Sequence, residues 1–313
     1  MNLAQDPAQI QSLLQQAANS IGQIILGKRR QIDLALTCLL AGGHLLIEDL
    51  PGVGKTTLAL ALAKTCGLEF RRVQFTSDLL PADITGISIY DASSQTFKFH
   101  PGPIFTQVLL ADEINRTTPK TQSALLEAME ENQVTLDGVS RPLPQPFFVI
   151  ATQNPTEQVG TFPLPESQLD RFLMRIEIGY PDQQAERELL IGRDRRQHIA
   201  QLPVVINPQT LTALQTRLQQ IHESKPLLDY LLALIRSSRL SPWFASGLSP
   251  RAGLALQKCA RAWAMLHGRD HVLPEDIQHV MPCVAAHRLQ IHPDHQHEKI
   301  DELINRLIRQ VPV

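Results

Sequence analysis

Apolar residues along the first 181 positions follow two alternating patterns. Helical spacing alternates with short apolar runs, which are typical of strands buried on both faces. The predicted helices span 7–23, 28–41, 55–66, 118–131 and 166–173, and the predicted strands lie at 44–48, 69–75, 107–113, 147–155 and within 172–181. Helices that alternate with buried strands indicate an α/β fold, so we expect a three-layer core around a parallel sheet.

After Pro181 the pattern changes, because strand-like runs disappear and helical periodicity dominates. The change predicts two domains, an α/β core over residues 1–182 and an all-helical linker and lid over residues 183–313. The predicted helices of the second part span 183–199, 208–222, 226–239, 250–266, 274–290 and 297–310.

Two hairpins are predicted inside the core. A polar turn at 91–95 separates two strand-like stretches, which predicts a hairpin near 86–100. The Asp137-Gly138 pair is a strong turn signal and predicts a second hairpin within 133–143.

Composition and charge narrow the class of protein. Of the 313 residues, 43% are hydrophobic and 19% are charged, which predicts a packed globular protein. The formal net charge of −2 lacks the basic excess typical of nucleic-acid binders. The four cysteines form no CxxC pair, so we expect them to be reduced and mostly buried. Without a signal-peptide pattern or a run of about 18 apolar residues, we expect no membrane span and a cytoplasmic location.

The segment 49–57 (DLPGVGKTT) lies between a predicted buried strand and a predicted helix. It matches the phosphate-binding pattern GxxxxGK[ST] except at its first position, where Asp49 replaces glycine. Its glycines let backbone N–H groups curl around phosphate oxygens, the lysine reaches the β- and γ-phosphates, and the Thr56 hydroxyl ligates Mg²⁺. An ordinary glycine-rich turn is the alternative. The candidate nucleotide-binding residues are Pro51, Gly52, Val53, Gly54, Lys55, Thr56 and Thr57.

Two later strand ends carry the polar side chains that such a loop requires. The run VLLADE ends in two acids, of which we assign Asp112 to the Mg²⁺ shell and Glu113 to the base that orients the attacking water. An apolar strand that ends in two acids is a weak signal alone, but it gains weight behind a phosphate-binding loop. Asn154 ends the next strand, where it either positions the water or caps the turn before Pro155.

Together these blocks resemble the MoxR family of AAA+ ATPases over nearly the whole chain. The motifs are GGHLLIEDLPGVGKTT, SDLLPADITG, FHPGPIFTQVLLADEINRTTPKTQSALLEAMEE, QVTLDG, PFFVIATQNP, GTFPLPESQLDRF and LSPRAGLAL. The resemblance implies an AAA+ P-loop core with a helical lid, ATP/ADP and Mg²⁺ as ligands, and ATP hydrolysis. It also implies rings, usually hexamers, that bind ATP between neighbouring subunits.

The resemblance assigns roles to further residues. Arg171, in the LDRF segment, would be the arginine finger that reaches the γ-phosphate in the adjacent subunit. Arg251, in the LSPRA segment, would be the sensor 2 residue that contacts the nucleotide of its own chain. Asn154 becomes sensor 1, and Gly27 ends the stretch 24–27 that packs near adenine.

Some of these positions have alternatives or departures. The residue pattern alone favours a salt bridge between Arg171 and either Asp170 or Glu166, and Arg116 is a second basic candidate for the interface. Asp49 departs from the first glycine of the loop, and we expect its negative charge to weaken phosphate affinity slightly.

The predicted function is that of a chaperone-like remodeller, which uses ATP hydrolysis to assemble or activate a partner protein or metalloenzyme complex. The resemblance further implies a homo-oligomeric ring, a von Willebrand A-domain partner, a protein client, and pore-lining hairpins near 84–103 and 132–146. The alternatives are an AAA+ nucleic-acid motor of the helicase type, disfavoured by the balanced charge, and a nucleotide-gated binding module without hydrolysis. We interpret the segment with His292, His295 and His297 as a solvated turn and not as a metal site.

Overall fold

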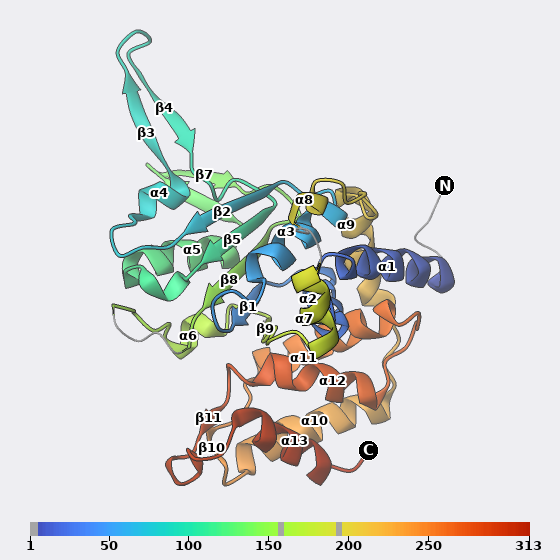
Figure 1. Ribbon diagram of the computed structural model, residues 1–313. Helices are drawn as coiled ribbons and strands as arrows, with labels where there is room; N and C mark the ends of the chain where they lie inside the picture. The colour runs from blue at the N-terminus through green and yellow to red at the C-terminus, as the bar shows by residue number, and fades with distance from the viewer. Residues whose placement is uncertain (1–5, 156–159, 192–195) are drawn as a thin grey trace.

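The computed structural model describes residues 6–155, 160–191 and 196–313. Strands gather in the first part of the chain, and a separate group of helices lies below them in Figure 1. This arrangement confirms the predicted α/β core with a parallel sheet followed by a helical lid.

The core is built on one five-stranded sheet in the order β2-β5-β8-β1-β9, and every neighbouring pair of strands is parallel. All five residues of the interior strand β5 are buried. Parallel strands end at the same edge, so the residues that follow β1, β5 and β8 meet there. The strands are β1 Leu45–Glu48, β2 Phe70–Gln74, β5 Val108–Asp112, β8 Phe148–Gln153 and β9 Met174–Ile176.

Two hydrophobic cores cover the two faces of the sheet, which confirms the three layers. Side chains alternate across a strand, so Val108 and Leu110 join the core of α1, α2 and α3, whereas Leu109 and Ala111 join the core of α5. The predicted helix at 166–173 is confined to the short α6. The helices of the core are α1 Pro7–Gly22, α2 Arg29–Leu40, α3 Lys55–Thr65, α4 Pro81–Thr85, η1 Ile114–Arg116, α5 Pro119–Glu131 and α6 Glu166–Leu169.

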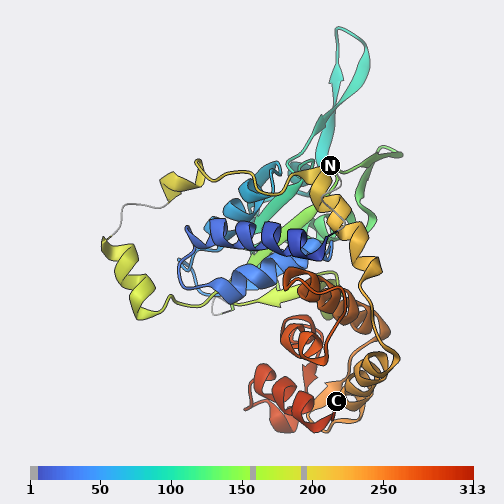
Figure 2. The same cartoon turned by 90° about the vertical axis from the view of Figure 1, so that its right-hand side faces the viewer.

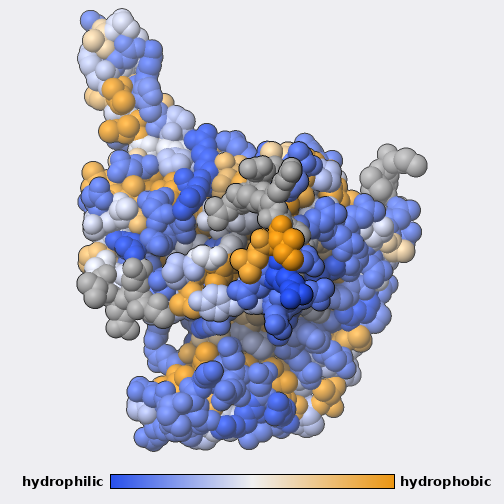
Figure 3. Space-filling model, in the orientation of Figure 1, coloured by the Kyte–Doolittle hydropathy of each residue, from blue (hydrophilic) through white to orange (hydrophobic). Residues whose placement is uncertain are grey.

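Both predicted hairpins are present. β3 (Gly86–Asp91) pairs with β4 (Thr96–Pro101), and β6 (Gln133–Leu136) pairs with β7 (Val139–Pro142), each in antiparallel register. The β3–β4 hairpin projects far from the core and carries exposed apolar side chains, among them Phe97 at 73% exposure (Figures 1 and 3). At its base, a Cβ atom on Gly86 would lie 2.4 Å from the His100 carbonyl oxygen, and the φ of +97° also favours glycine.

The second part of the chain is helical with one exception. Strands β10 and β11 form a small antiparallel sheet in the lid, so the expectation of an all-helical region was incomplete. Strands of two or three residues carry no periodicity that a sequence pattern could reveal. The elements are α7 Gln183–Ile191, α8 Arg196–Ile199, α9 Pro208–Arg217, η2 Leu218–Gln220, α10 Lys225–Leu240, β10 Phe244–Ser246, α11 Pro250–Leu266, α12 Pro274–Ala285, β11 Gln290–Ile291, η3 Pro293–His295 and α13 Ile300–Gln310.

The segment after β9 leaves the sheet and then returns to the core (Figure 2). Helices α8 and α9 contact α3 and α2, and the N–H groups of Val205 and Ile206 donate to the Thr65 carbonyl at 2.9 and 3.1 Å. The single helix expected over 183–199 is therefore two helices, with 192–195 outside the described residues. The domain boundary after residue 182 stays a prediction. Across the described residues, no helix has the length and apolar character to cross a membrane.

Candidate functional site

A cavity of about 390 Å³ lies at the carboxyl edge of the parallel sheet. It brings together the phosphate-binding loop, the two acids at the end of β5 and the asparagine after β8, which the sequence predicts at one site. We call it the phosphate cleft. Its lining residues are Pro51, Gly52, Gly54, Lys55, Thr56, Thr57, Leu60, Arg72, Asp112, Glu113, Asn154 and Ile199.

The loop adopts the backbone shape that its glycines predict. Gly52 and Gly54 have φ values of +86° and +97°, which L side chains rarely adopt, and Gly54 immediately precedes helix α3. The Lys55 ammonium donates to the Asp49 carbonyl at 2.6 Å and stays over the loop. Burial lowers the pKa of Lys55, and the nearby carboxylates oppose that shift. Helix α3 therefore begins with a cation and free N–H groups, the usual setting for phosphate.

A second cavity of about 580 Å³ adjoins the loop and shares Gly52, Gly54 and Thr57 with the phosphate cleft. Its wall is more apolar, because residues 24–26, Val53 and the α7 end at 189–190 line it. This is the position that the resemblance assigns to adenine. Gly27 itself does not line the cavity; a Cβ there would lie 3.0 Å from an Asp182 carboxylate oxygen.

Asp49 has a structural role that the loop motif did not predict. Its Oδ2 accepts hydrogen bonds from the N–H groups of Ile178 and Gly179, both at 2.6 Å, and its Oδ1 accepts from Leu50 at 2.8 Å. The carboxylate is buried and is not part of the cleft lining. It therefore ties the phosphate-binding loop to the chain after β9. No short motif could have revealed this contact, because the partners are about 130 residues apart.

Asp112 is held by two side chains from neighbouring strands. Its Oδ1 accepts from the Thr152 hydroxyl at 2.6 Å, and its Oδ2 forms an ion pair with the Arg72 guanidinium at 2.6 Å. Arg72 lines the phosphate cleft but was not among the predicted site residues. The alternation in EFRRVQF places its side chain on the same strand face as Gln74, which was the available signal.

Glu113 has its own set of partners. Gln74 donates to its Oε2 at 2.7 Å, and Arg116 lies 3.0 Å from the same oxygen. The Glu113 backbone is in the left-handed region at φ 58°, and its N–H donates to the Thr152 hydroxyl at 2.9 Å. Left-handed conformations of residues other than glycine are strained and often lie at functional sites.

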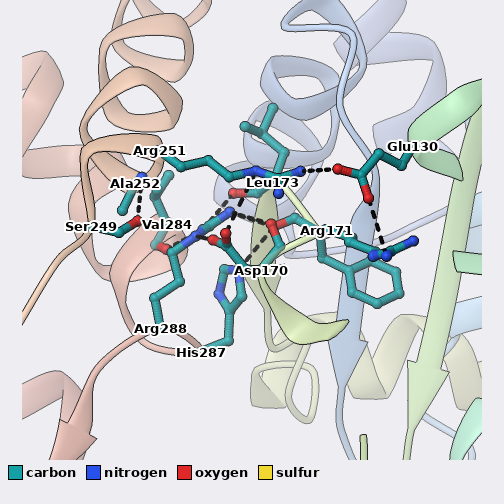
Figure 4. Close-up of polar contacts among 11 residues, drawn as sticks. Glu130, Asp170, Arg171, Leu173, Ser249, Arg251, Ala252, Val284, His287 and Arg288 are labelled. Carbon is teal, nitrogen blue, oxygen red and sulfur yellow. Dashed lines mark hydrogen bonds and ion pairs between the residues drawn. The ribbon is translucent and has the colours of Figure 1, made fainter. Parts of the chain in front are cut away.

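Arg171 and Arg251 lie outside the phosphate cleft, in a cavity of about 450 Å³ between core and lid. Both contact Glu130 on α5, at 3.2 and 3.4 Å, and Arg251 also lies 3.6 Å from Asp170 (Figure 4). We call these four residues the arginine cluster. The salt-bridge alternative for Arg171 named Asp170 or Glu166, whereas the observed partner is Glu130. Arg251 lies on the lid in this cluster and not in the phosphate cleft, and its expected contact with the nucleotide of its own chain stays a prediction.

A phosphate-binding loop between β1 and a helix, an acid pair at the end of β5 in the same sheet and a helical lid define a P-loop nucleotide-binding protein. Residues 44–174 match the model of the ATPase family associated with various cellular activities (AAA), and residues 236–307 match an AAA lid domain.

Similar proteins place the chain more narrowly. It is 39% identical to the chaperone MoxR1 of Mycobacterium tuberculosis over 95% of this chain and 81% of that protein, and 48% identical to YeaC of Bacillus subtilis over 92% and 90%. A crystal structure from Cytophaga hutchinsonii superposes with a TM-score of 0.88 at 34% identity and covers 98% of this chain and 96% of that one. The chain belongs to the MoxR-type AAA+ ATPases, as the motifs predicted.

Proposed function

We propose that the protein hydrolyses ATP at sites shared between neighbouring subunits of a ring. The observation that carries the proposal is the separation of Arg171 and Arg251 from the phosphate cleft of the same chain. Phosphoryl transfer needs both a cradle for the phosphates and a cation that stabilises the charge of the transition state. One chain has both parts at different places, so a second copy has to bring its arginine cluster to the cleft of the first.

The residues of the cleft fit Mg²⁺ and a triphosphate. The Thr56 hydroxyl and the buried Asp112 carboxylate line the same cavity and are the hard oxygen ligands that Mg²⁺ prefers. Bound there, the ion would neutralise phosphate charge. We assign Lys55 to the β- and γ-phosphates, with the loop glycines supplying N–H donors.

We assign Glu113 to the orientation of the attacking water. Its Oε2 is held by Gln74 and Arg116, so the carboxylate is fixed at the cleft wall. Asn154 lines the same cavity and offers a second polar group for the water, as sensor 1. Arg171 would stabilise the transition state in the adjacent subunit, and Arg251, as sensor 2, would contact the nucleotide of its own chain when the lid moves toward it.

The cellular role follows from the family alone. We infer a chaperone-like remodeller in the cytoplasm that forms a ring, most simply a hexamer. It would act on a protein client with a von Willebrand A-domain partner, in the assembly or activation of a protein or metalloenzyme complex. The relative named as a chaperone supports this inference. The projecting β3–β4 hairpin is our candidate for contact with the client.

Steady-state phosphate release from the purified protein with ATP and Mg²⁺ tests the proposal. We expect activity per subunit to rise with protein concentration as rings assemble. Glu113→Gln should bind ATP but release phosphate on the order of 100-fold more slowly. Absence of turnover under assembling conditions, activity independent of assembly, or strict dependence on DNA would each contradict the proposal.

A further inference from the structure

Arg288 is an arginine of the lid that the proposed reaction does not use. It follows helix α12, and its side chain is only 5% exposed. Arginine is almost never buried to this degree unless every part of its charge is paired. The partners of Arg288 therefore indicate why the charge is there.

Those partners lie in the segment 170–173, which carries Arg171 (Figure 4). The Arg288 Nε donates to the Asp170 carboxylate at 2.6 Å. The terminal nitrogens donate to the carbonyls of Phe172 at 2.7 Å, Leu173 at 3.2 Å and Asp170 at 3.3 Å. One further bond, to the Val284 carbonyl, stays within the lid. A guanidinium has five N–H donors in a fixed fork, so this segment takes most of them.

The neighbouring residue strengthens the same attachment. The His287 Nε2 donates to the Phe172 carbonyl at 3.0 Å, so two consecutive lid residues hold one carbonyl of the segment. Burial lowers the pKa of His287 well below its ordinary range, and the imidazole is neutral at physiological pH. The backbone under Arg171 is thereby fixed to the lid by buried hydrogen bonds.

The Arg171 side chain is held quite differently. Its one ion pair in the arginine cluster is with Glu130, which is 40% exposed. Exposed pairs of this kind contribute little, about 0–1 kcal/mol, so an incoming phosphate can take Arg171 from Glu130 at small cost. The backbone of Arg171 is therefore held firmly, while its guanidinium can leave Glu130. A residue that acts on another subunit needs this combination, because small errors of position cost large factors in rate.

We propose that Arg288 is a positioning residue, which fixes the segment 170–173 to the lid so that Arg171 reaches the nucleotide of the neighbouring subunit. The proposal rests on the proposed function, in which Arg171 acts in trans. With this attachment, the position of the lid in one subunit determines the position of Arg171 at the ATP site of the next subunit. Movement of the lid during one subunit's cycle would then shift the finger that serves its neighbour.

Mixed assemblies give a directional test. Arg288→Gln should lower kcat by on the order of 100-fold, as expected for a misplaced catalytic group, while ATP affinity stays within about twofold. Mixing with Lys55→Ala subunits, which have an intact finger but no working cleft, should restore phosphate release. A purely structural defect of the lid would not be repaired by a neighbour. Arg288→Lys keeps the charge but lacks the forked N–H donors of the guanidinium, so we expect a smaller loss of kcat and the same rescue by Lys55→Ala subunits. If Arg288→Gln does not fold, the Arg288→Lys variant provides the test.

Arg269→Gln is the matched control. Arg269 is also a partly buried lid arginine with a two-pronged bond to a buried carboxylate, that of Asp276, at 2.6 and 2.7 Å. Its removal should lower the melting temperature but leave kcat per folded subunit within about twofold, because no contact joins it to the segment 170–173 among the bonds found in the described chain.

The outcomes separate the two proposals. If Lys55→Ala subunits rescue Arg171→Ala but rescue neither Arg288 variant, the positioning role is wrong and the shared site stands. A loss of ATP affinity in the Arg288 variants equal to the loss of turnover would also overturn it. If Arg171→Ala is not rescued either, the shared site itself fails, and the positioning role fails with it.

Discussion

The phosphate cleft and the arginine cluster are held in opposite ways. In the cleft, backbone geometry dominates: two glycines set the loop, and the buried Asp49 carboxylate binds three N–H groups. In the cluster, side-chain ion pairs dominate, and Arg171, Arg251 and Glu130 are 28%, 55% and 40% exposed. The first region is fixed in the single chain. In the second region, the side chains of Arg171 and Arg251 pair with acids of the same cluster.

The difference indicates which region is complete before assembly. Exposed ion pairs contribute about 0–1 kcal/mol each, so the partners in the cluster exchange readily. The N–H groups that bind the buried Asp49 carboxylate do not exchange partners in this way. We therefore interpret the cleft as the half of the proposed site that is formed in the single chain. The cluster is the half that changes its partners when a neighbouring subunit brings phosphates to it.

The largest effect is expected from Arg171→Ala. An arginine finger contributes on the order of 10³–10⁵ in kcat, so turnover should nearly vanish while ATP binding by the preformed cleft stays unchanged. Phosphate release and equilibrium binding of a fluorescent nucleotide measure the two quantities. Arg306→Ala is the control, since this lid arginine pairs with Glu298 on the surface and should leave both unchanged. A parallel fall in binding and turnover would show that the two regions are not separate.

Asp49 tests how strongly the cleft is preformed. Asp49→Ala leaves the N–H groups of Ile178 and Gly179 without acceptors and should cost about 2–4 kcal/mol of unfolding free energy, measured by urea denaturation. Asp49→Asn keeps an acceptor and should lose less. The informative control is Asp49→Gly, which restores the strict phosphate-loop pattern. If that variant is as stable as the parent, the carboxylate does not hold the loop.

The same residues show what a sequence can predict. The sheet, the loop, the acids and Asn154 were predictable because each depends on a short stretch, and parallel strand ends must meet. The Asp49 tie, the Arg72 ion pair and the lid attachment of Arg288 join residues about 130, 40 and 118 positions apart. No local pattern encodes such pairs. The contacts of Arg251 with Glu130 and Asp170 could not be predicted for the same reason, since they depend on how the lid packs on the core.

Mild acid should affect the cluster side of the molecule. His44 lines the cavity of the arginine cluster; its Nε2 donates to the Met129 carbonyl, and its Nδ1 accepts from Val149. Burial lowers the pKa of His44 from 6.5 to about 4. Between these two pH values the imidazole is protonated in the unfolded chain but neutral in the folded chain. The contribution of His44 to stability is complete above pH 6.5 and falls toward pH 4 by about 1.4 kcal/mol per pH unit, or about 2 kcal/mol at pH 5.

Urea denaturation at pH 7.5 and pH 5 measures this loss. His44→Gln should be less stable than the parent at pH 7.5 but lose less between the two values. His100→Gln, on the exposed strand β4, should behave as the parent does. The residues found to line the phosphate cleft include no histidine. An unchanged pH dependence in His44→Gln would place the acid sensitivity elsewhere.

The smallest effect is expected at Arg72, whose ion pair in the cleft is partly exposed, like the ion pairs of the cluster. Its half-exposed guanidinium occupies the Asp112 carboxylate that we assign to Mg²⁺. Arg72→Gln should therefore lower the Mg²⁺ concentration needed for half-maximal nucleotide binding, by less than about fivefold because such pairs contribute about 0–1 kcal/mol. Arg71→Gln, which loses an exposed pair with Glu69, is the matched control. A higher Mg²⁺ requirement in Arg72→Gln would mean that the arginine supports the metal site, and that even the preformed half depends on an exchangeable ion pair.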